Sequence, residues 1–102
     1  MNKVLNLLGI ARRAGKLVMG TDSLISALPS KKVKLVFVAS DASFATYDKI
    51  DKKAYYYQAT VVNKYSTEEL SQALGVTSIK VLGLIDEGFS QAILKELERG
   101  EF

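Results

Sequence analysis

The run Leu35–Ala39 constrains the fold of this chain most, because it is apolar at every position. A strand with one face toward water alternates apolar and polar side chains, whereas a strand that is apolar on both faces has to be covered on both. A second run, Ile79–Ile85, is interrupted only by Lys80 and Gly83. We therefore expect a central sheet with helices packed on both of its faces.

Shorter patterns on either side of these runs alternate between helix and strand. Apolar residues recur at spacings of three and four in five segments, which is typical of helices that bury one face. The predicted helices span 2–14, 21–28, 66–75 and 86–97, and a further helix begins at a cap, Asp41 or Ser43, and ends at Tyr57. The predicted strands span 17–19, 35–39, 60–63 and 79–85. The 102 residues predict one domain, 1–102, with an α/β fold: a three-layer α/β/α sandwich with a four-stranded central sheet.

The chain contains no cysteine and no histidine. That composition excludes a disulfide framework, thiol catalysis and the usual zinc sites, and it removes the commonest general base at neutral pH. The apolar run 4–11 is too short for a signal peptide, is broken by Asn6 and leads into Arg12 and Arg13. No segment has the length of a membrane span, so we expect a cytoplasmic protein with no membrane partner, no cofactor and no metal.

The stretch 15–28 predicts a strand that passes directly into a helix. Leu17–Met19 is short and apolar, and Gly20 can adopt backbone angles that other residues avoid. Thr21 or Asp22 can then cap the following helix with a side-chain oxygen. The first amides of that helix face outward and attract an anion. The simpler interpretation is an ordinary strand-to-helix connection that binds nothing.

Positive charge is concentrated in the first third of the chain. Residues 1–34 carry seven Lys or Arg against one Asp, whereas residues 65–102 carry three Lys or Arg against seven Asp or Glu. This asymmetry predicts one side that faces a polyanion, although a basic loop is also explained by solvation alone. The residues expected to add attraction are Arg12, Arg13 and Lys16, just upstream of the corner in sequence, and Lys31 and Lys32 in the following loop.

Three groups of residues together resemble one known family. They are Gly9–Gly20, with the sequence GIARRAGKLVMG, Lys34–Ser43, with the sequence KLVFVASDAS, and Ala73–Gly75 together with the strand before Asp86–Gly88. Over nearly its whole length the chain is similar to the L7Ae/L30e family of ribosomal proteins, and within that family to a bacterial branch. Members of this family characteristically bind RNA kink-turns, so the resemblance implies structured RNA, including ribosomal RNA, as the partner.

The resemblance also implies which residues contact the RNA. They are Gly20, Thr21, Asp22, Ser23 and Ser26 after the first strand, Ser43 and Tyr47 after the second strand, and Val76, Thr77 and Ser78 before the last strand. RNA-binding members typically read Gly-Thr-Asn-Glu with a lysine three residues on, where this chain has Asp22, Ser23 and Ser26. A carboxylate only accepts hydrogen bonds, whereas the amide that it replaces also donates them.

Two other functions stay open from the sequence. Asp41, Asp86 and Glu87 follow strands, where open α/β sheets place metals and substrates, and with Lys49 they describe a magnesium-dependent phosphoryl-transfer enzyme. Each carboxylate is also explained as a helix cap or a first-turn acid, so we expect no catalytic residue. Alternatively, the acidic last third, Glu68–Glu101, is a surface for ribosomal or RNA-bound proteins. The sequence leaves the oligomeric state undetermined.

Three consecutive tyrosines, Tyr55–Tyr57, end the third predicted helix. They form either a stacking platform for bases or part of the packing against the sheet. Aromatic residues at the end of an amphipathic helix usually pack, so we expect them in the core or at its rim. The sequence as a whole predicts a non-enzymatic RNA-binding domain that recognises kinked or bulged RNA through the corner Gly20–Ser26.

Overall fold

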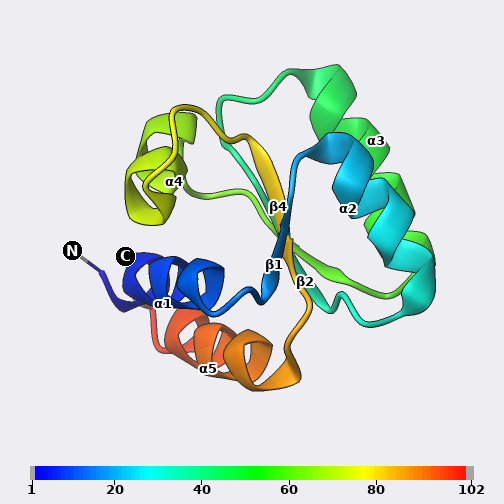
Figure 1. Cartoon of the computed structure of the whole chain (residues 1–102). Coiled ribbons are helices and arrows are strands. Elements are labelled where there is room, and N and C mark those ends of the chain that lie inside the picture. The colour runs from blue at the N-terminus through cyan, green and yellow to red at the C-terminus, as the bar shows by residue number, and fades with distance from the viewer. Residues whose placement is uncertain (1, 101–102) are drawn as a thin grey trace.

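A computed structural model of the protein describes residues 2–100 and shows a four-stranded sheet between two layers of helices (Figure 1). In chain order the elements are α1 (Lys3–Arg13), β1 (Leu17–Met19), α2 (Thr21–Ala27), a single 3₁₀ turn (Leu28–Ser30), β2 (Leu35–Val38), α3 (Phe44–Tyr56), β3 (Thr60–Val62), α4 (Thr67–Leu74), β4 (Val81–Leu84) and α5 (Glu87–Glu98). The predicted α/β/α sandwich is confirmed. No helix within residues 2–100 is long and apolar enough to cross a membrane.

The strands lie in the order β1-β4-β2-β3, so β4 and β2 are central. Every residue of these two strands is buried, as expected for strands that are covered on both faces. The last strand is shorter than predicted, because the Ile79 N–H donates to Ser71 Oγ at 2.9 Å and the regular strand begins only at Val81.

The direction of β4 separates carboxylates that the enzyme hypothesis needs together. β4 runs antiparallel to β2, with Val38 opposite Val81. Asp41 follows β2 and Asp86 follows β4, so they lie at opposite ends of the sheet. A shared metal or substrate site for these carboxylates would need them at the same end of parallel strands, and among the four strands only β2 and β3 are parallel.

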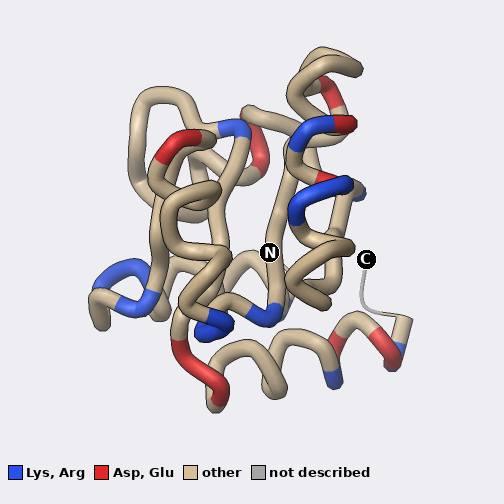
Figure 2. The backbone as a smooth tube through the Cα atoms, turned by 90° about the vertical axis from the view of Figure 1, so that its right-hand side faces the viewer, with Lys and Arg blue, Asp and Glu red and all other residues tan. Residues whose placement is uncertain are grey.

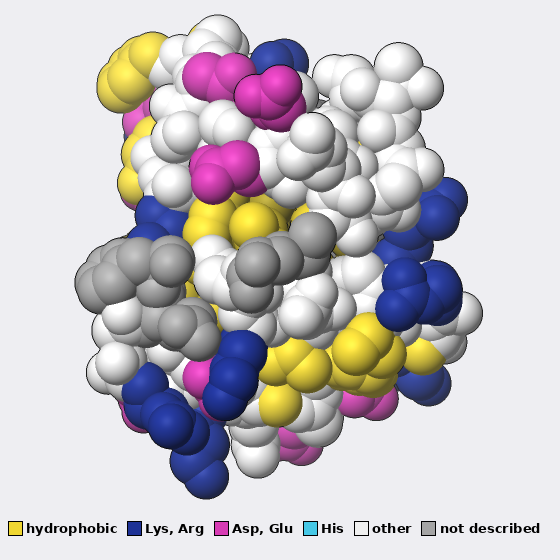
Figure 3. Space-filling view, turned by 90° about the vertical axis from the view of Figure 1, so that its left-hand side faces the viewer, with side chains coloured by type: hydrophobic (Ala, Val, Ile, Leu, Met, Phe, Trp, Pro, Cys, Tyr) yellow, Lys and Arg dark blue, Asp and Glu magenta, His cyan; other side chains and the backbone are white. Residues whose placement is uncertain are grey.

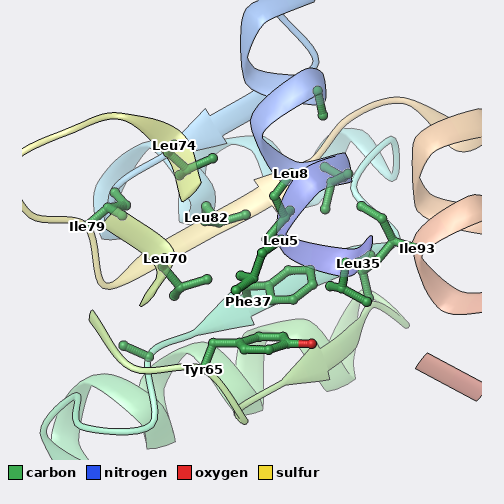
Figure 4. Packing of buried hydrophobic residues seen from close by; sticks show 14 residues of the cluster. Leu5, Leu8, Leu35, Phe37, Tyr65, Leu70, Leu74, Ile79, Leu82 and Ile93 are labelled. Atoms are coloured by element: carbon green, nitrogen blue, oxygen red, sulfur yellow. The ribbon is translucent and has the colours of Figure 1, made fainter. Parts of the chain in front are cut away.

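Alternate residues of the central strands face two separate cores. On one face, Phe37 and Leu82 pack against α1, α4 and α5, and Figure 4 shows both beside Leu8 of α1. The Phe37 ring also stacks on Tyr65, with the ring centroids 6.1 Å apart. This core holds three helices on one face of the sheet.

The second core fixes the position of α2 on the opposite face. Val36 and Val81 pack with Leu24 of α2 and Ile50 of α3, and all four are fully buried. A Cβ on Gly83 would come within 2.6 Å of Leu24 Cδ1. Gly83 thus lets α2 approach β4 closely. This close packing fixes the distance between the sheet and the connection from β1 to α2.

Candidate nucleic-acid interface

Three segments that are far apart in the sequence meet at one end of the sheet, at the top of Figure 1. The Gly20 N–H donates to the Val81 carbonyl at 2.8 Å, and the Ala39 N–H donates to the Lys80 carbonyl at 2.7 Å. The end of β1, the start of β4 and the end of β2 therefore lie side by side. We call the surface that they carry the corner surface; it consists of residues 20–26, 40–47 and 76–80.

The start of α2 differs from the starts of the other α-helices. Each of those is capped by a side-chain oxygen that accepts from the N–H three residues later; the caps are Asn2, Ser43, Ser66 and Asp86. α2 follows Gly20, which has φ 99° and ψ 153°, and no side chain caps it. The expectation that Thr21 or Asp22 caps α2 is wrong, because the ladder with β4 extends to Gly20 and both residues lie inside the helix. The first turn thus keeps backbone donors for an acceptor from outside.

The predicted contact residues on the corner surface differ in exposure. The exposed ones carry hydroxyl or carboxylate groups and are Asp22, Ser23, Ser26, Ser43, Thr77 and Ser78. Thr21 is half-buried, as are Tyr47, which packs against the α2–α3 core, and Val76, which packs against the core of α1, α4 and α5. The corner surface therefore presents polar groups fully and these two apolar side chains in part.

An exposed aromatic ring on the corner surface was missed by the sequence analysis. Phe44 is the first residue of α3 and is 79% exposed. It lies three residues before Tyr47, so helical spacing alone places it on the buried stripe. The sequence signal that could have revealed this exposure is the position of Phe44 directly after Ser43, at the beginning of the helix. There the apolar stripe of α3 extends beyond the end of the sheet.

A polar network joins α4 to the corner surface. The Asp41 carboxylate accepts from the Thr67 N–H at 2.9 Å and from the Thr67 hydroxyl at 2.8 Å, while Lys80 Nζ lies 3.0 Å from the same hydroxyl oxygen. The backbone hydrogen bond from Thr67, followed by its hydroxyl, lowers the pKa of Asp41 from its ordinary value. Asp41 thus supports the start of α4, and the cap of α3 is Ser43. Within residues 2–100, no three His, Cys, Asp or Glu side chains form a group that could hold a metal ion.

Lys16, one of the residues predicted to reinforce the corner, lies at the other end of the sheet. The Lys16 carbonyl accepts from the Ile85 N–H at 3.0 Å, beyond the far end of β4. Four residues of extended chain separate Lys16 from Gly20, which corresponds to about 13 Å. Arg12 and Arg13 end α1, which leads to Lys16. The expectation that Lys16 strengthens the anion attraction of α2 is therefore wrong, because β1 separates Lys16 from Gly20. For Arg12 and Arg13 it stays a prediction.

Three further lysines share that opposite end. Lys31, Lys32 and Lys34 line a hollow together with Ile85 and Glu87. We call the surface formed by Lys16, Lys31, Lys32 and Lys34 the basic end. In Figure 2 the segments around the start of α2, at the top, carry acidic as well as basic residues, whereas several basic segments lie toward the bottom of the sheet.

The acidic last third does not form one continuous surface. Glu68 and Glu69 begin α4, Glu96 and Glu98 lie near the end of α5, and α4 and α5 each pack on α1. Figure 3 shows acidic side chains toward the top and the bottom of the face that carries α1, α4 and α5, with apolar and basic side chains between them. Glu101 lies outside the described residues.

Comparisons with known proteins agree with this architecture. A model of the "Ribosomal protein L7Ae/L30e/S12e/Gadd45 family" matches residues 2–94. "RNA-binding protein YlxQ" of Enterococcus faecium is 41% identical over 98 residues, covering 96% of this chain and 93% of that protein. "RNA-binding protein YlxQ" of Bacillus subtilis is 33% identical over 92 residues, covering 90% of this chain and 92% of that protein.

Solved structures show the same fold. A Bacillus halodurans protein, described as one with unknown function, superposes with a TM-score of 0.90 at 33% identity, covering 94% of this chain and 97% of that chain. The "15.5kD RNA binding protein" of Giardia lamblia superposes with a TM-score of 0.81 at 16% identity, covering 94% and 82%, a likeness of fold alone. With the family match spanning nearly the whole chain, the protein belongs to the ribosomal protein L7Ae/L30e/S12e/Gadd45 family.

Proposed function

We propose that this protein is a non-enzymatic RNA-binding protein that recognises kinked or bulged RNA through the corner surface. The observation that carries the proposal is the meeting of three distant segments at one end of the sheet, around a helix start without a side-chain cap. Membership of this family and the names of the two YlxQ relatives support RNA as the ligand.

The chemistry of the corner surface suits a kink better than a regular duplex. Duplex RNA hides its base edges in a deep, narrow groove, whereas a kink splays bases outward and brings phosphates together. The uncapped amides of α2 can donate to a phosphate, and the exposed Phe44 ring offers a stacking face for an unpaired base. Asp22 accepts hydrogen bonds only, so it selects an amino or N–H edge of a base.

Charge at the corner surface is mixed, which has a consequence for specificity. Asp22 and Asp41 are exposed there, and Lys80 is hydrogen-bonded to Thr67. General attraction to the RNA polyanion comes instead from the basic end, at the opposite end of the sheet. We therefore infer that the corner surface contributes most of the discrimination between RNA shapes and the basic end contributes salt-sensitive affinity.

The partner that we propose is a structured RNA of the ribosome or of another ribonucleoprotein, in the cytoplasm. The fold family supplies the ribosomal context. The alternative in which the acidic last third binds ribosomal or RNA-bound proteins is less well supported, because those acidic residues lie on two helices separated by α1.

The test is a titration with a kink-turn RNA and with an unkinked duplex of equal length, at two salt concentrations. We expect tighter binding to the kinked RNA. Ser26→Glu places a negative charge on the exposed face of α2, and we expect it to weaken binding to the kinked RNA by about tenfold or more. Gln91→Glu adds the same charge to α5 in the other layer, one turn from Glu87 and the basic end, and is expected to leave the ratio of affinities for the two RNAs unchanged.

Two results would contradict the proposal. Equal affinity for both RNAs would show that no kink is recognised, and identical effects of Ser26→Glu and Gln91→Glu would remove the corner surface as the site. If neither RNA binds, a basic ribosomal protein is the next ligand to titrate, with Glu96→Gln as the variant that should weaken its binding.

A further inference from the structure

The C-terminal half of α3 carries aromatic rings that the packing of the fold does not use. Tyr55 is 85% exposed and Tyr56 is 76% exposed, so the expectation that these two tyrosines lie in the core or at its rim is wrong. Only Tyr57 is half-buried, and it packs against the α2–α3 core. Ile50, Ala54 and Tyr57 form the inward stripe of α3, so Tyr55 and Tyr56, which directly follow Ala54, lie off that stripe and face away from the core.

The Tyr56 ring stands between two hollows. One hollow, of about 540 Å³, is lined by Lys49, Lys52, Lys53, Tyr56 and Tyr57. The other, of about 420 Å³, is lined by Tyr55, Tyr56, Gln58 and Ala59. Space is thus available on two sides of one exposed aromatic side chain.

Tyr57 holds that ring in place. The two rings meet edge-on, with centroids 4.8 Å apart and an interplanar angle of 87°. Because Tyr57 is anchored in the core, this contact restricts the Tyr56 side chain before any ligand arrives. A ring that is held in advance loses less conformational entropy when a base stacks on it.

Lysines surround the same ring. Lys49, Lys52 and Lys53 lie seven, four and three residues before Tyr56, so they share its side of the helix. Lys52 is paired with Asp48 at 3.0 Å. Lys49 and Lys53 are exposed and make no ion pair with any residue in the range 2–100, so their charges are free to meet phosphates.

This surface is distinct from the corner surface. α3 begins at the corner surface and its 13 residues span about 20 Å, so its last turn lies toward the opposite end of the sheet. The Thr60 N–H, shortly after the tyrosines, donates to the Lys34 carbonyl at 2.9 Å. The tyrosines therefore neighbour the loop that contributes Lys31, Lys32 and Lys34 to the basic end.

We propose that Lys49, Lys53 and Tyr56 bind an unpaired RNA segment, with a base stacked on Tyr56 and the flanking phosphates on the two lysines. Aromatic rings interleaved with cations are how proteins bind single strands without sequence preference, because every base has a π-face. That RNA is the ligand rests on the proposed function, but this site is separate from the corner surface. An acidic polypeptide would satisfy the lysines and leave the exposed ring and its hollows unused.

The experiment measures binding of a fluorescently labelled single-stranded RNA of about ten nucleotides, a typical site size for such surfaces, by anisotropy at low salt. We expect the unmodified protein to bind, Tyr56→Ala to weaken binding by roughly 5- to 100-fold, and Tyr56→Phe to retain it, because phenylalanine still stacks. Lys49→Gln and Lys53→Gln should each lower the slope of log affinity against log salt by about 0.7. Lys95→Gln, which removes an exposed charge from α5, is the matched control and should change nothing.

Three outcomes would overturn this inference: no binding of the single strand, equal affinity of Tyr56→Ala and the unmodified protein, or a loss in Tyr56→Phe as large as in Tyr56→Ala. Polyglutamate that binds as tightly as the RNA, with the same dependence on Tyr56, would assign the site to an acidic protein and also overturn it. The kinked RNA without a single-stranded tail separates this site from the proposed function. Its binding should respond to Ser26→Glu and not to Tyr56→Ala, so either site can fail without the other.

Discussion

The two ends of the sheet carry different groups that the sequence places in one stretch. Gly15–Leu28 contains the uncapped start of α2, and a run of basic residues lies just before and just after it. In the structure, β1 places Lys16 at the basic end and Gly20 at the corner surface. The uncapped backbone donors of α2 thus lie at one end of the sheet, and exposed lysine side chains are more prominent at the other.

The difference teaches that proximity in sequence is a poor guide to electrostatic cooperation across a strand. Even a strand of three residues separates its flanking residues by more than a Debye length of physiological salt, which is about 8 Å. An ion at the corner surface therefore receives little from Lys16. We therefore expect changes at the two ends to differ in their effects on RNA affinity, on its salt dependence and on the preference between RNA shapes.

The largest expected effect comes from changing the support beneath the corner surface. Gly83→Ala would bring a Cβ within 2.6 Å of Leu24 Cδ1 and 3.0 Å of Val33 Cγ1, both in a tightly packed core. We expect the free energy of unfolding to fall by roughly 1–3 kcal/mol, as measured by urea denaturation. Displacement of α2 should also weaken binding to the kinked RNA and spare single-strand binding.

A variant in the other core controls for loss of stability alone. Ile93→Val removes one methyl group from a fully buried residue of α5 and should cost roughly 0.5–1.5 kcal/mol. It lies away from α2, so affinity for the kinked RNA should stay the same. If Gly83→Ala has no more effect on that affinity than Ile93→Val, the packing of α2 on β4 does not control the corner surface.

A smaller effect is expected from adding charge to the corner surface. Ser26→Lys introduces a positive charge on the exposed side of α2. We expect affinity for kinked RNA to rise by roughly fivefold to tenfold, since a charge-assisted contact to phosphate is added. Filter binding at two salt concentrations measures this. An equal gain for the unkinked duplex would mean that Ser26 does not face the kink.

Removing charge from the basic end should act on all RNAs alike. In the double variant Lys31→Gln with Lys32→Gln, the slope of log affinity against log salt should fall by up to about 1.4–1.8, depending on how many phosphates the two lysines neutralise. The ratio of affinities for kinked and unkinked RNA should stay constant. A change in that ratio would show that the basic end reads shape, and the proposed separation of tasks would be wrong.

The smallest effect concerns the Asp41 carboxylate on the corner surface. The pKa of Asp41 is lowered from 3.8 in the folded protein, so its hydrogen bonds to Thr67 contribute stability above the unfolded pKa, and this is lost as pH falls through the folded value. Asp41→Asn should therefore be less stable than the unmodified protein at pH 7, and the gap should narrow in strongly acidic solution. Urea midpoints at both pH values measure it. A gap that does not depend on pH would show that the carboxylate charge is unimportant here.

Local patterns predicted much of the fold because the responsible forces are local or periodic. The continuous apolar run at Leu35–Ala39 predicted a strand buried on both faces, and helical spacing predicted a helix over 66–75, where the structure has α4 (Thr67–Leu74). The start of α2 was predicted less well, since Thr21 and Asp22 have good capping chemistry yet the sheet ladder continues to Gly20. The exposure of Tyr55 and Tyr56 was not predicted, because the general tendency of aromatic residues to pack was weighed above helical spacing, which places both off the buried stripe of α3.

The sequence by itself determined the elements, their order and the two-sided burial of the sheet, because these follow from apolar periodicity, caps and glycines within a few residues. Only the tertiary structure decided that β4 runs antiparallel to its neighbours, that Asp41 and Asp86 part to opposite ends, and that the basic residues lie away from the uncapped helix start. Strand direction and pairing depend on contacts between residues 25 or more positions apart in the sequence, such as Leu35 with Thr60 and Gly20 with Val81. No local pattern records such contacts, yet they determine which side chains share a surface.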